Sequence, residues 1–123
     1  MSGPLRNIKK AQKESLLFRE ISRLFMQTAM DDTRLQGVIL SRVSLSVDKG
    51  VCYIYFYSYK GKKHFDEVLE VLKLYKPSLR KALSKLPSRY TPELVFKYDE
   101  DLEKQMKLEE ILDKVKEQDV EQE

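Results

Sequence analysis

Apolar residues recur with helical spacing in three stretches of the chain, residues 7–30, 64–86 and 100–117. In the first stretch, spacings of four, three and one place these side chains on one face: Leu17, Ile21, Leu24 and Phe25. The second stretch carries the longest stripe: Phe65, Val68, Leu69, Leu72, Tyr75, Leu79, Leu83 and Leu86. The third is acidic, with apolar positions at Leu102, Met106, Leu108, Ile111, Leu112 and Val115. We predict a helical region in each stretch.

Alternation with a period of two predicts three strands, at residues 38–47, 51–59 and 93–98. In the second strand, one face carries Cys52, Ile54 and Phe56, and the other carries Val51 and a row of tyrosines. Between the first two strands, Asp48-Lys49-Gly50 predicts a hairpin turn in which Gly50 takes a positive φ.

Pro77 lies inside the longest helical stripe. A proline has no N–H to donate to the carbonyl of Lys73, and it pushes Lys76 away from helical angles. The apolar phase nevertheless continues across it. We therefore predict two helices joined by a kink at Tyr75, Lys76 and Pro77, both packed on one sheet.

The predicted order is helix, strand, strand, helix-kink-helix, strand, helix. Three strands with helices on one face make an α+β two-layer sandwich with a three-stranded sheet. A helical crossover joins the second and third strands, so we expect them to run parallel. We predict one domain over residues 1–117 and a frayed tail over residues 118–123.

Composition bounds the class of protein. No run of about 18 apolar residues exists, and the basic segment Met1 to Lys13 lacks the apolar core of a signal peptide. The single cysteine, Cys52, has no partner for an internal disulfide, which suits a reducing compartment. We expect a cytoplasmic protein that has no contact with a membrane.

The charge is unevenly distributed. Residues 1–89 carry 18 Lys and Arg against 8 Asp and Glu, a net +10, whereas residues 90–123 carry 5 against 12, a net −7. A basic body with an acidic end suggests a polyanionic partner for the body. Ordinary solubilising charge would give similar totals, so the positions of the cations must decide.

The sequence offers few candidates for catalytic residues. His64 is the only histidine, and we expect it to be an ordinary exposed side chain at a helix start. Cys52 lies in the middle of a strand on its apolar face, and no phosphate-binding glycine motif is present. Asp31-Asp32 and Asp99-Glu100-Asp101 flank predicted helices, where capping accounts for them better than a metal does. We predict no catalytic residue, metal site, cofactor or small-molecule substrate.

The tyrosine row at Tyr53, Tyr55 and Tyr57 has two interpretations. Aromatic rings on a sheet can stack nucleobases, as they do in some RNA-binding modules. Cross-strand packing on the back of a two-layer sandwich produces the same row without a ligand. The packing interpretation is favoured.

Basic residues near the predicted kink are the best candidates for contact with a polyanion. Lys73, Lys76 and Arg80 are spaced by three and four, so they line one side of the helical pair. We predict that they bind RNA phosphates together with further cations along the chain: Lys81, Lys85 and Arg89, and near the N-terminus Arg6, Lys9, Lys10 and Lys13. The alternative is a solvated helix face.

Three segments resemble motifs of the ribosome-binding factor A family, whose domain is KH-like with type II topology. They are Asp32-Thr33-Arg34-Leu35, Leu45-Ser46-Val47-Asp48 and Arg89-Tyr90-Thr91-Pro92-Glu93-Leu94-Val95-Phe96. A KH domain usually clamps nucleic acid with a GxxG loop between two helices, and this family has a kinked helix in its place. Where the family has an Ala-x-Gly kink, this chain has Tyr75-Lys76-Pro77.

The resemblance implies a monomeric factor that binds the small ribosomal subunit and its rRNA late in maturation, with roles in rRNA processing and cold adaptation. It implies no cofactor and no reaction. Two alternatives stay open: a KH-like module for free single-stranded RNA, and a protein-interaction adapter that uses the acidic C-terminal helix.

Overall fold

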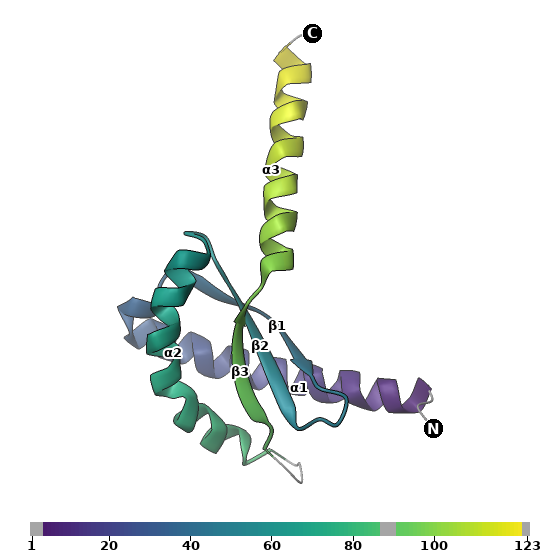
Figure 1. Ribbon diagram of the computed structural model, residues 1–123, viewed down its shortest axis with the longest axis vertical. Helices are drawn as coiled ribbons and strands as arrows, with labels where there is room; N and C mark the ends of the chain where they lie inside the picture. The colour runs from purple at the N-terminus through teal and green to yellow at the C-terminus, as the bar shows by residue number, and fades with distance from the viewer. Residues whose placement is uncertain (1–3, 87–90, 122–123) are drawn as a thin grey trace.

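A computed structural model describes residues 4–86 and 91–121 of the chain and shows an α+β fold (Figure 1). Its elements are α1 (Pro4–Asp31), the 3-10 turn η1 (Thr33–Leu35), β1 (Val38–Leu45), β2 (Val51–Ser58), α2 (Lys62–Leu83), β3 (Glu93–Tyr98) and α3 (Glu100–Glu121). The sheet has the order β1-β2-β3, with β1 antiparallel and β3 parallel to β2. The predicted strands and their directions are confirmed.

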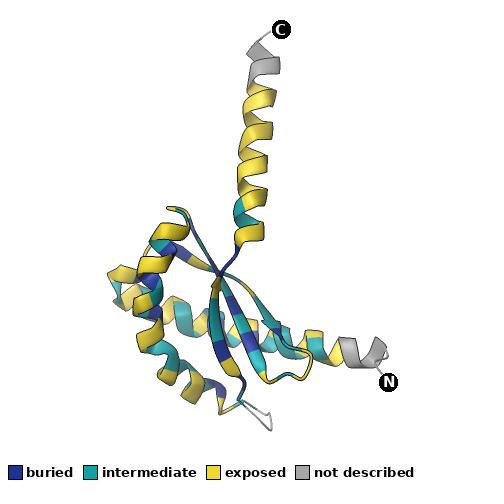
Figure 2. Ribbon diagram, viewed as in Figure 1, coloured by how far each residue is buried: buried dark blue, intermediate teal, exposed yellow. Residues whose placement is uncertain are grey.

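The core lies between one face of the sheet and the two helices α1 and α2. Phe56 is at its centre: its ring lies 5.3 Å from that of Phe25 in α1, 6.2 Å from Phe65 in α2 and 5.7 Å from Phe96 in β3. Cys52 and Ile54 on the same face are fully buried, as the alternation predicted. Figure 2 shows the buried positions following the strands and the inner faces of both helices.

The expected pair of kinked helices is one helix, α2, which continues through Pro77. Proline leaves the Lys73 carbonyl without its usual helical donor, but the apolar stripe keeps both halves on the sheet. Its buried members are Phe65, Val68, Leu72 and Leu83. In Figure 1, α2 curves around one side of the sheet.

The hairpin between β1 and β2 differs from the prediction at its turn. Lys49, and not Gly50, has the positive φ, at 62°. Its amide donates to the Ser46 carbonyl at 2.9 Å, and Asp48 accepts from the Gly50 amide at 3.0 Å. The turn therefore closes one residue earlier than the glycine suggested.

Helix α3 stands away from the rest of the molecule (Figure 1). It runs to Glu121, four residues beyond the predicted end of this helix at residue 117. Its apolar positions from Met106 to Val115 are all exposed, and Figure 2 shows almost the whole helix in the colour of exposed residues. The amphipathic pattern of this segment therefore does not mark a face packed on the sheet.

Candidate nucleic-acid interface

Three of the cations predicted to bind RNA, Lys73, Lys76 and Arg80, lie on one side of α2, beside the free edge of β3. Lys76 Nζ lies 3.6 Å from Glu93 Oε1 and Arg80 Nη1 lies 3.7 Å from Glu93 Oε2, at the start of β3. Lys76 also lies over the ring of Phe96, 5.8 Å from its centroid. Lys73 pairs with Glu70 one turn earlier on the helix, at 3.2 Å. We call Lys73, Lys76 and Arg80 the α2 flank.

These ion pairs leave the α2 flank able to bind phosphate. Exposed pairs of this kind contribute about 0–1 kcal/mol each, because water screens them. A phosphate group can therefore displace the Glu93 carboxylate at small cost. Since β3 is an edge strand, its outer backbone N–H groups lie beside the flank and can donate hydrogen bonds as well.

The remaining predicted RNA-binding residues do not all join the α2 flank. Lys81 is turned about 100° from Arg80 around the helix, and both Lys81 and Lys85 are exposed. Arg89 lies outside the described residues. Lys81 therefore enlarges the positive surface of α2 on a side turned away from Arg80, and Lys85 follows the end of the helix at Leu83.

The basic N-terminal residues form a separate group. Lys9, Lys10 and Lys13 lie in the N-terminal half of α1, which in Figure 1 extends past the sheet on the side opposite α2. Arg6 belongs to the same helix, but its side chain is outside the described part of the chain. The structure therefore places the N-terminal cations predicted to bind RNA apart from those of the α2 flank.

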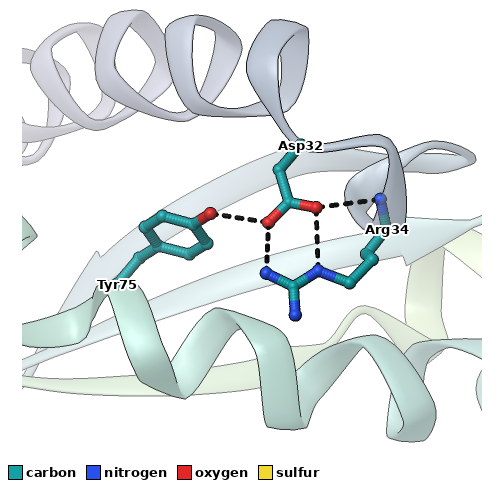
Figure 3. Close-up of polar contacts among 3 residues, drawn as sticks. All are labelled: Asp32, Arg34 and Tyr75. Atoms are coloured by element: carbon teal, nitrogen blue, oxygen red, sulfur yellow. Dashed lines mark hydrogen bonds and ion pairs between the residues drawn. The ribbon is translucent and has the colours of Figure 1, made fainter.

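A polar clamp joins the turn after α1 to the middle of α2 (Figure 3). Arg34 donates from Nε and Nη2 to the two Asp32 carboxylate oxygens, at 2.9 and 2.7 Å. Tyr75 donates its hydroxyl to Asp32 Oδ2 at 2.6 Å. The Arg34 and Tyr75 hydrogen bonds hold the pKa of Asp32 well below its ordinary value. Because Tyr75 is two residues before Pro77, the clamp fixes α2 next to its proline.

The clamp was only partly predictable. Asp32 caps η1 by accepting from the Arg34 amide at 3.0 Å, which confirms the capping interpretation. Tyr75 was expected only as a member of the apolar stripe and the kink. Nothing in the sequence indicated that its hydroxyl reaches a carboxylate 43 residues away.

Neither of the two reactive side chains considered from the sequence has a catalytic setting. Cys52 is fully buried, and burial raises the pKa of its thiol to about 12. His64 was expected to be an exposed side chain. It is instead half-buried, with Nδ1 2.6 Å from the hydroxyl of the buried Ser58, which ties the start of α2 to the end of β2.

Comparison with known proteins identifies the family. The family model described as ribosome-binding factor A matches residues 9–112. This chain belongs to the ribosome-binding factor A family. Relatives in that family include the ribosome-binding factor A proteins of Prochlorococcus marinus strain MIT 9301, 34% identical over 89% of this chain and 86% of the relative, and of Clostridium tetani, 29% identical over 80% and 83%.

Solved structures of the family share the fold. The crystal structure of ribosome-binding factor A from Thermus thermophilus is similar with a TM-score of 0.59 and 26% identity, over 71% of this chain and 92% of that one. A Thermotoga maritima protein provisionally assigned as ribosome binding factor A is similar with a TM-score of 0.63 and 28% identity, over 72% and 84%. The KH-like arrangement implied by the sequence resemblance is consistent with both.

The ribosome-binding factor A family is named for binding to a particle and not for a reaction. Within residues 4–86 and 91–121, no group of three or more His, Cys, Asp or Glu side chains is placed to hold a metal ion. None of the described helices is long and apolar enough to cross a bilayer.

Proposed function

We propose that this chain binds the small ribosomal subunit and contacts its rRNA through the α2 flank during late maturation of that subunit. Membership of the ribosome-binding factor A family supports the ribosome as partner. The protein acts in the cytoplasm as a monomer, without a cofactor, and its binding aids rRNA processing and growth in the cold.

The observation that carries this proposal is the grouping of Lys73, Lys76 and Arg80 beside an open strand edge. Phosphate binding needs fixed positive charge together with hydrogen-bond donors, and this surface offers both. The chain has no GxxG loop between helices. The cations of α2 therefore replace the backbone clamp that such a loop would provide.

The test replaces all three cations of the α2 flank by glutamine, as Lys73→Gln, Lys76→Gln and Arg80→Gln in one variant. Each lost phosphate contact should reduce the slope of log affinity against log salt by about 0.7–0.9. Binding to purified small subunits should therefore weaken, and its dependence on salt should become shallower. The measurement is co-sedimentation with small subunits over a range of salt concentrations.

The matched control removes the same number of positive charges from α3, as Lys104→Gln, Lys107→Gln and Lys114→Gln. All three lysines are exposed on the projecting helix. If both variants bound small subunits with the same affinity and salt slope, net charge alone would govern binding. The proposal for the α2 flank would then be wrong.

One observation favours a protein-interaction adapter as a second candidate. Leu108, Ile111, Leu112 and Val115 form an apolar stripe on α3, with exposed fractions of 47–58%. Helix α3 is acidic overall, which suits a protein partner better than RNA. If the adapter function is the main one, deletion of residues 100–123 abolishes binding to the particle, while the α2-flank variant binds normally.

A further inference from the structure

The face of the sheet turned away from the core carries a second set of cations and rings. In the strand register, Arg42 of β1 is opposite Tyr55 of β2, and Tyr55 is opposite Lys97 of β3. Residues opposite one another in a sheet point to the same side. A cation, an aromatic ring and a cation therefore form one row across the three strands. We call this row the open-face row.

Arg42 is held in place from two directions. Its guanidinium carbon lies 3.9 Å from the centroid of the Tyr55 ring, and its Nε donates to Asp99 Oδ2 at 3.2 Å. The β-bulge between Leu40 and Arg42 sets this position, because the extra residue re-aims the side chain that follows. With its side chain 47% exposed, Arg42 rests on Tyr55 and remains accessible from solvent.

The rest of the open face adds a further cation and a further aromatic ring, the two kinds of side chain that bind single-stranded nucleic acid. Lys97 is exposed, with Nζ 4.6 Å from the centroid of the Tyr53 ring. A hollow beside the start of α3 is lined by all three members of the open-face row and by Lys62, Glu100 and Asp101, and it reaches the core residues Phe65, Phe96 and Tyr98. In Figure 1, none of the described helices crosses in front of the strands on this face.

We propose that the open-face row binds single-stranded RNA, with a base stacked on Arg42 and Tyr55 and a backbone phosphate bound by Lys97. Bases of single strands stack on aromatic rings and on the plane of arginine, whereas paired bases are not available for this contact. The inference rests on the proposed function for its source of RNA, an unpaired rRNA segment. It adds a second contact surface, on the side of the sheet opposite the core.

The tyrosine row thus has a function besides packing. Simple cross-strand packing explains why Tyr53 and Tyr55 are half-buried. It does not explain why the Arg42 guanidinium lies over a ring that none of the described helices covers, while the buried Asp99 carboxylate fixes its Nε. A fixed guanidinium loses little conformational entropy when a base stacks on it.

Acidic residues at the rim of the hollow give a further means of testing the site. Asp101 Oδ2 lies 3.7 Å from Arg42 Nη2, and Glu100 pairs with Lys62 at 3.8 Å. Asp101 is exposed and repels a phosphate approaching the open-face row. Removal of its charge should therefore strengthen binding of RNA at this face.

The experiment measures binding of a fluorescein-labelled uridine octanucleotide by anisotropy, with the full chain at low salt. Arg42→Lys keeps the positive charge but removes the planar guanidinium, and Tyr55→Leu removes the ring beneath it. Each should weaken binding about tenfold, the effect of losing one stacked base. Asp101→Asn should strengthen binding. Tyr59→Leu, which removes an exposed ring beyond the end of β2, is the matched control and should bind like the wild type.

An NMR titration of the wild-type chain tests the same site without any variant, so it does not depend on whether a variant folds. Addition of the same octanucleotide should shift the amide signals of Tyr53, Tyr55 and Lys97. Shifts confined to α2, or equal affinity of Arg42→Lys, Tyr55→Leu and wild type, would overturn the inference.

Co-sedimentation of the same variants with small subunits separates this inference from the proposed function. If the wild type binds small subunits, but Arg42→Lys and Tyr55→Leu bind the octanucleotide as tightly as the wild type does, the proposed function stands and the inference fails. If the wild type binds the octanucleotide but not small subunits, and Arg42→Lys weakens binding of the octanucleotide, the inference stands and the proposed function fails.

Discussion

At the scale of single residues, Asp99 joins three parts of the chain that are far apart in sequence. Its carboxylate accepts from the Ser41 hydroxyl and from Arg42 in β1, and from the Leu102 amide in the first turn of α3. Its amide donates to the Phe56 carbonyl at 2.7 Å. The sequence predicted the helix cap, but the contacts with β1 lie 57 and 58 residues away and depend on the bulge.

The contribution of the Asp99 contacts to the free energy of unfolding can be measured with the variant Asp99→Asn. Asparagine keeps the cap to Leu102 but loses the charge that Arg42 and Ser41 bind. The free energy of unfolding should fall by about 2 kcal/mol, the usual size for hydrogen bonds to a buried charged group. Urea unfolding gives the value. Asp101→Asn, at an exposed position, should change it by less than about 0.5 kcal/mol, and a similar loss in both variants would contradict this role.

Stability should also fall in acid, because the pKa values of Asp32 and Asp99 are both lowered in the folded chain. Burial alone would raise the pKa of Asp99, but hydrogen bonds from Ser41, Leu102 and Arg42 hold it below its ordinary value. A lowered carboxyl pKa stabilises the fold above the unfolded pKa, near pH 4, and this contribution is lost as the pH falls through the folded pKa. Urea midpoints measured from about pH 6 downward should decline below about pH 4. The decline should be smaller in Asp99→Asn.

Glu93 should act against RNA binding, because it pairs with both Lys76 and Arg80. Glu93→Gln removes the competing carboxylate and should tighten binding to small subunits, most clearly at low salt. Co-sedimentation measures the change. Glu70→Gln, which releases only Lys73, should have a smaller effect, so weaker binding of Glu93→Gln than of wild type would count against the α2 flank as the interface.

At the scale of elements, periodicity predicted the helices and strands closely, because apolar spacing determines which side chains can reach a common core. The departures occur where periodicity carries no information. The positive φ of the hairpin turn falls on Lys49, a matter of local hydrogen bonding through Ser46 and Asp48. The apolar positions of α3 from Met106 to Val115 have helical spacing, yet they are exposed in the part of the chain that the structure describes.

The hairpin turn should become more stable with Lys49→Gly. Glycine takes a positive φ without the strain of a side chain, at some cost in the entropy of the unfolded chain. The net increase in the free energy of unfolding should be about 0.5–1 kcal/mol, measured by urea unfolding. Lys60→Gly, at a position where φ is not positive, should instead lower stability. If Lys49→Gly were less stable than Lys60→Gly, the positive φ assigned to Lys49 would be wrong.

Deletion of residues 104–123 should leave the fold nearly as stable as it is in the full chain. Side chains from Lys104 to Glu117 are exposed, so little burial is lost. The Tm should change by less than about 3 °C, and thermal unfolding followed by circular dichroism at a wavelength sensitive to the tyrosine rings would measure it. A large fall in Tm would mean that α3 packs on the body in solution.

At the scale of the whole molecule, the order of elements was sufficient to predict the layers and the strand directions. It was not sufficient to predict which cations lie together. Spacing along one helix identified Lys73, Lys76 and Arg80, but the N-terminal lysines proved to lie elsewhere, and the open-face row draws one residue from each of three strands. Such groupings depend on register and bulges, which a single sequence leaves undetermined.

The central claim is that the chain binds the free small ribosomal subunit through positive charge. The most direct test is co-sedimentation of the wild-type chain with small subunits, large subunits and assembled ribosomes at roughly 50 and 200 mM salt. We predict selective binding to free small subunits that weakens strongly at the higher salt. Equal binding to all three particles, or binding to small subunits that does not respond to salt, would contradict the account.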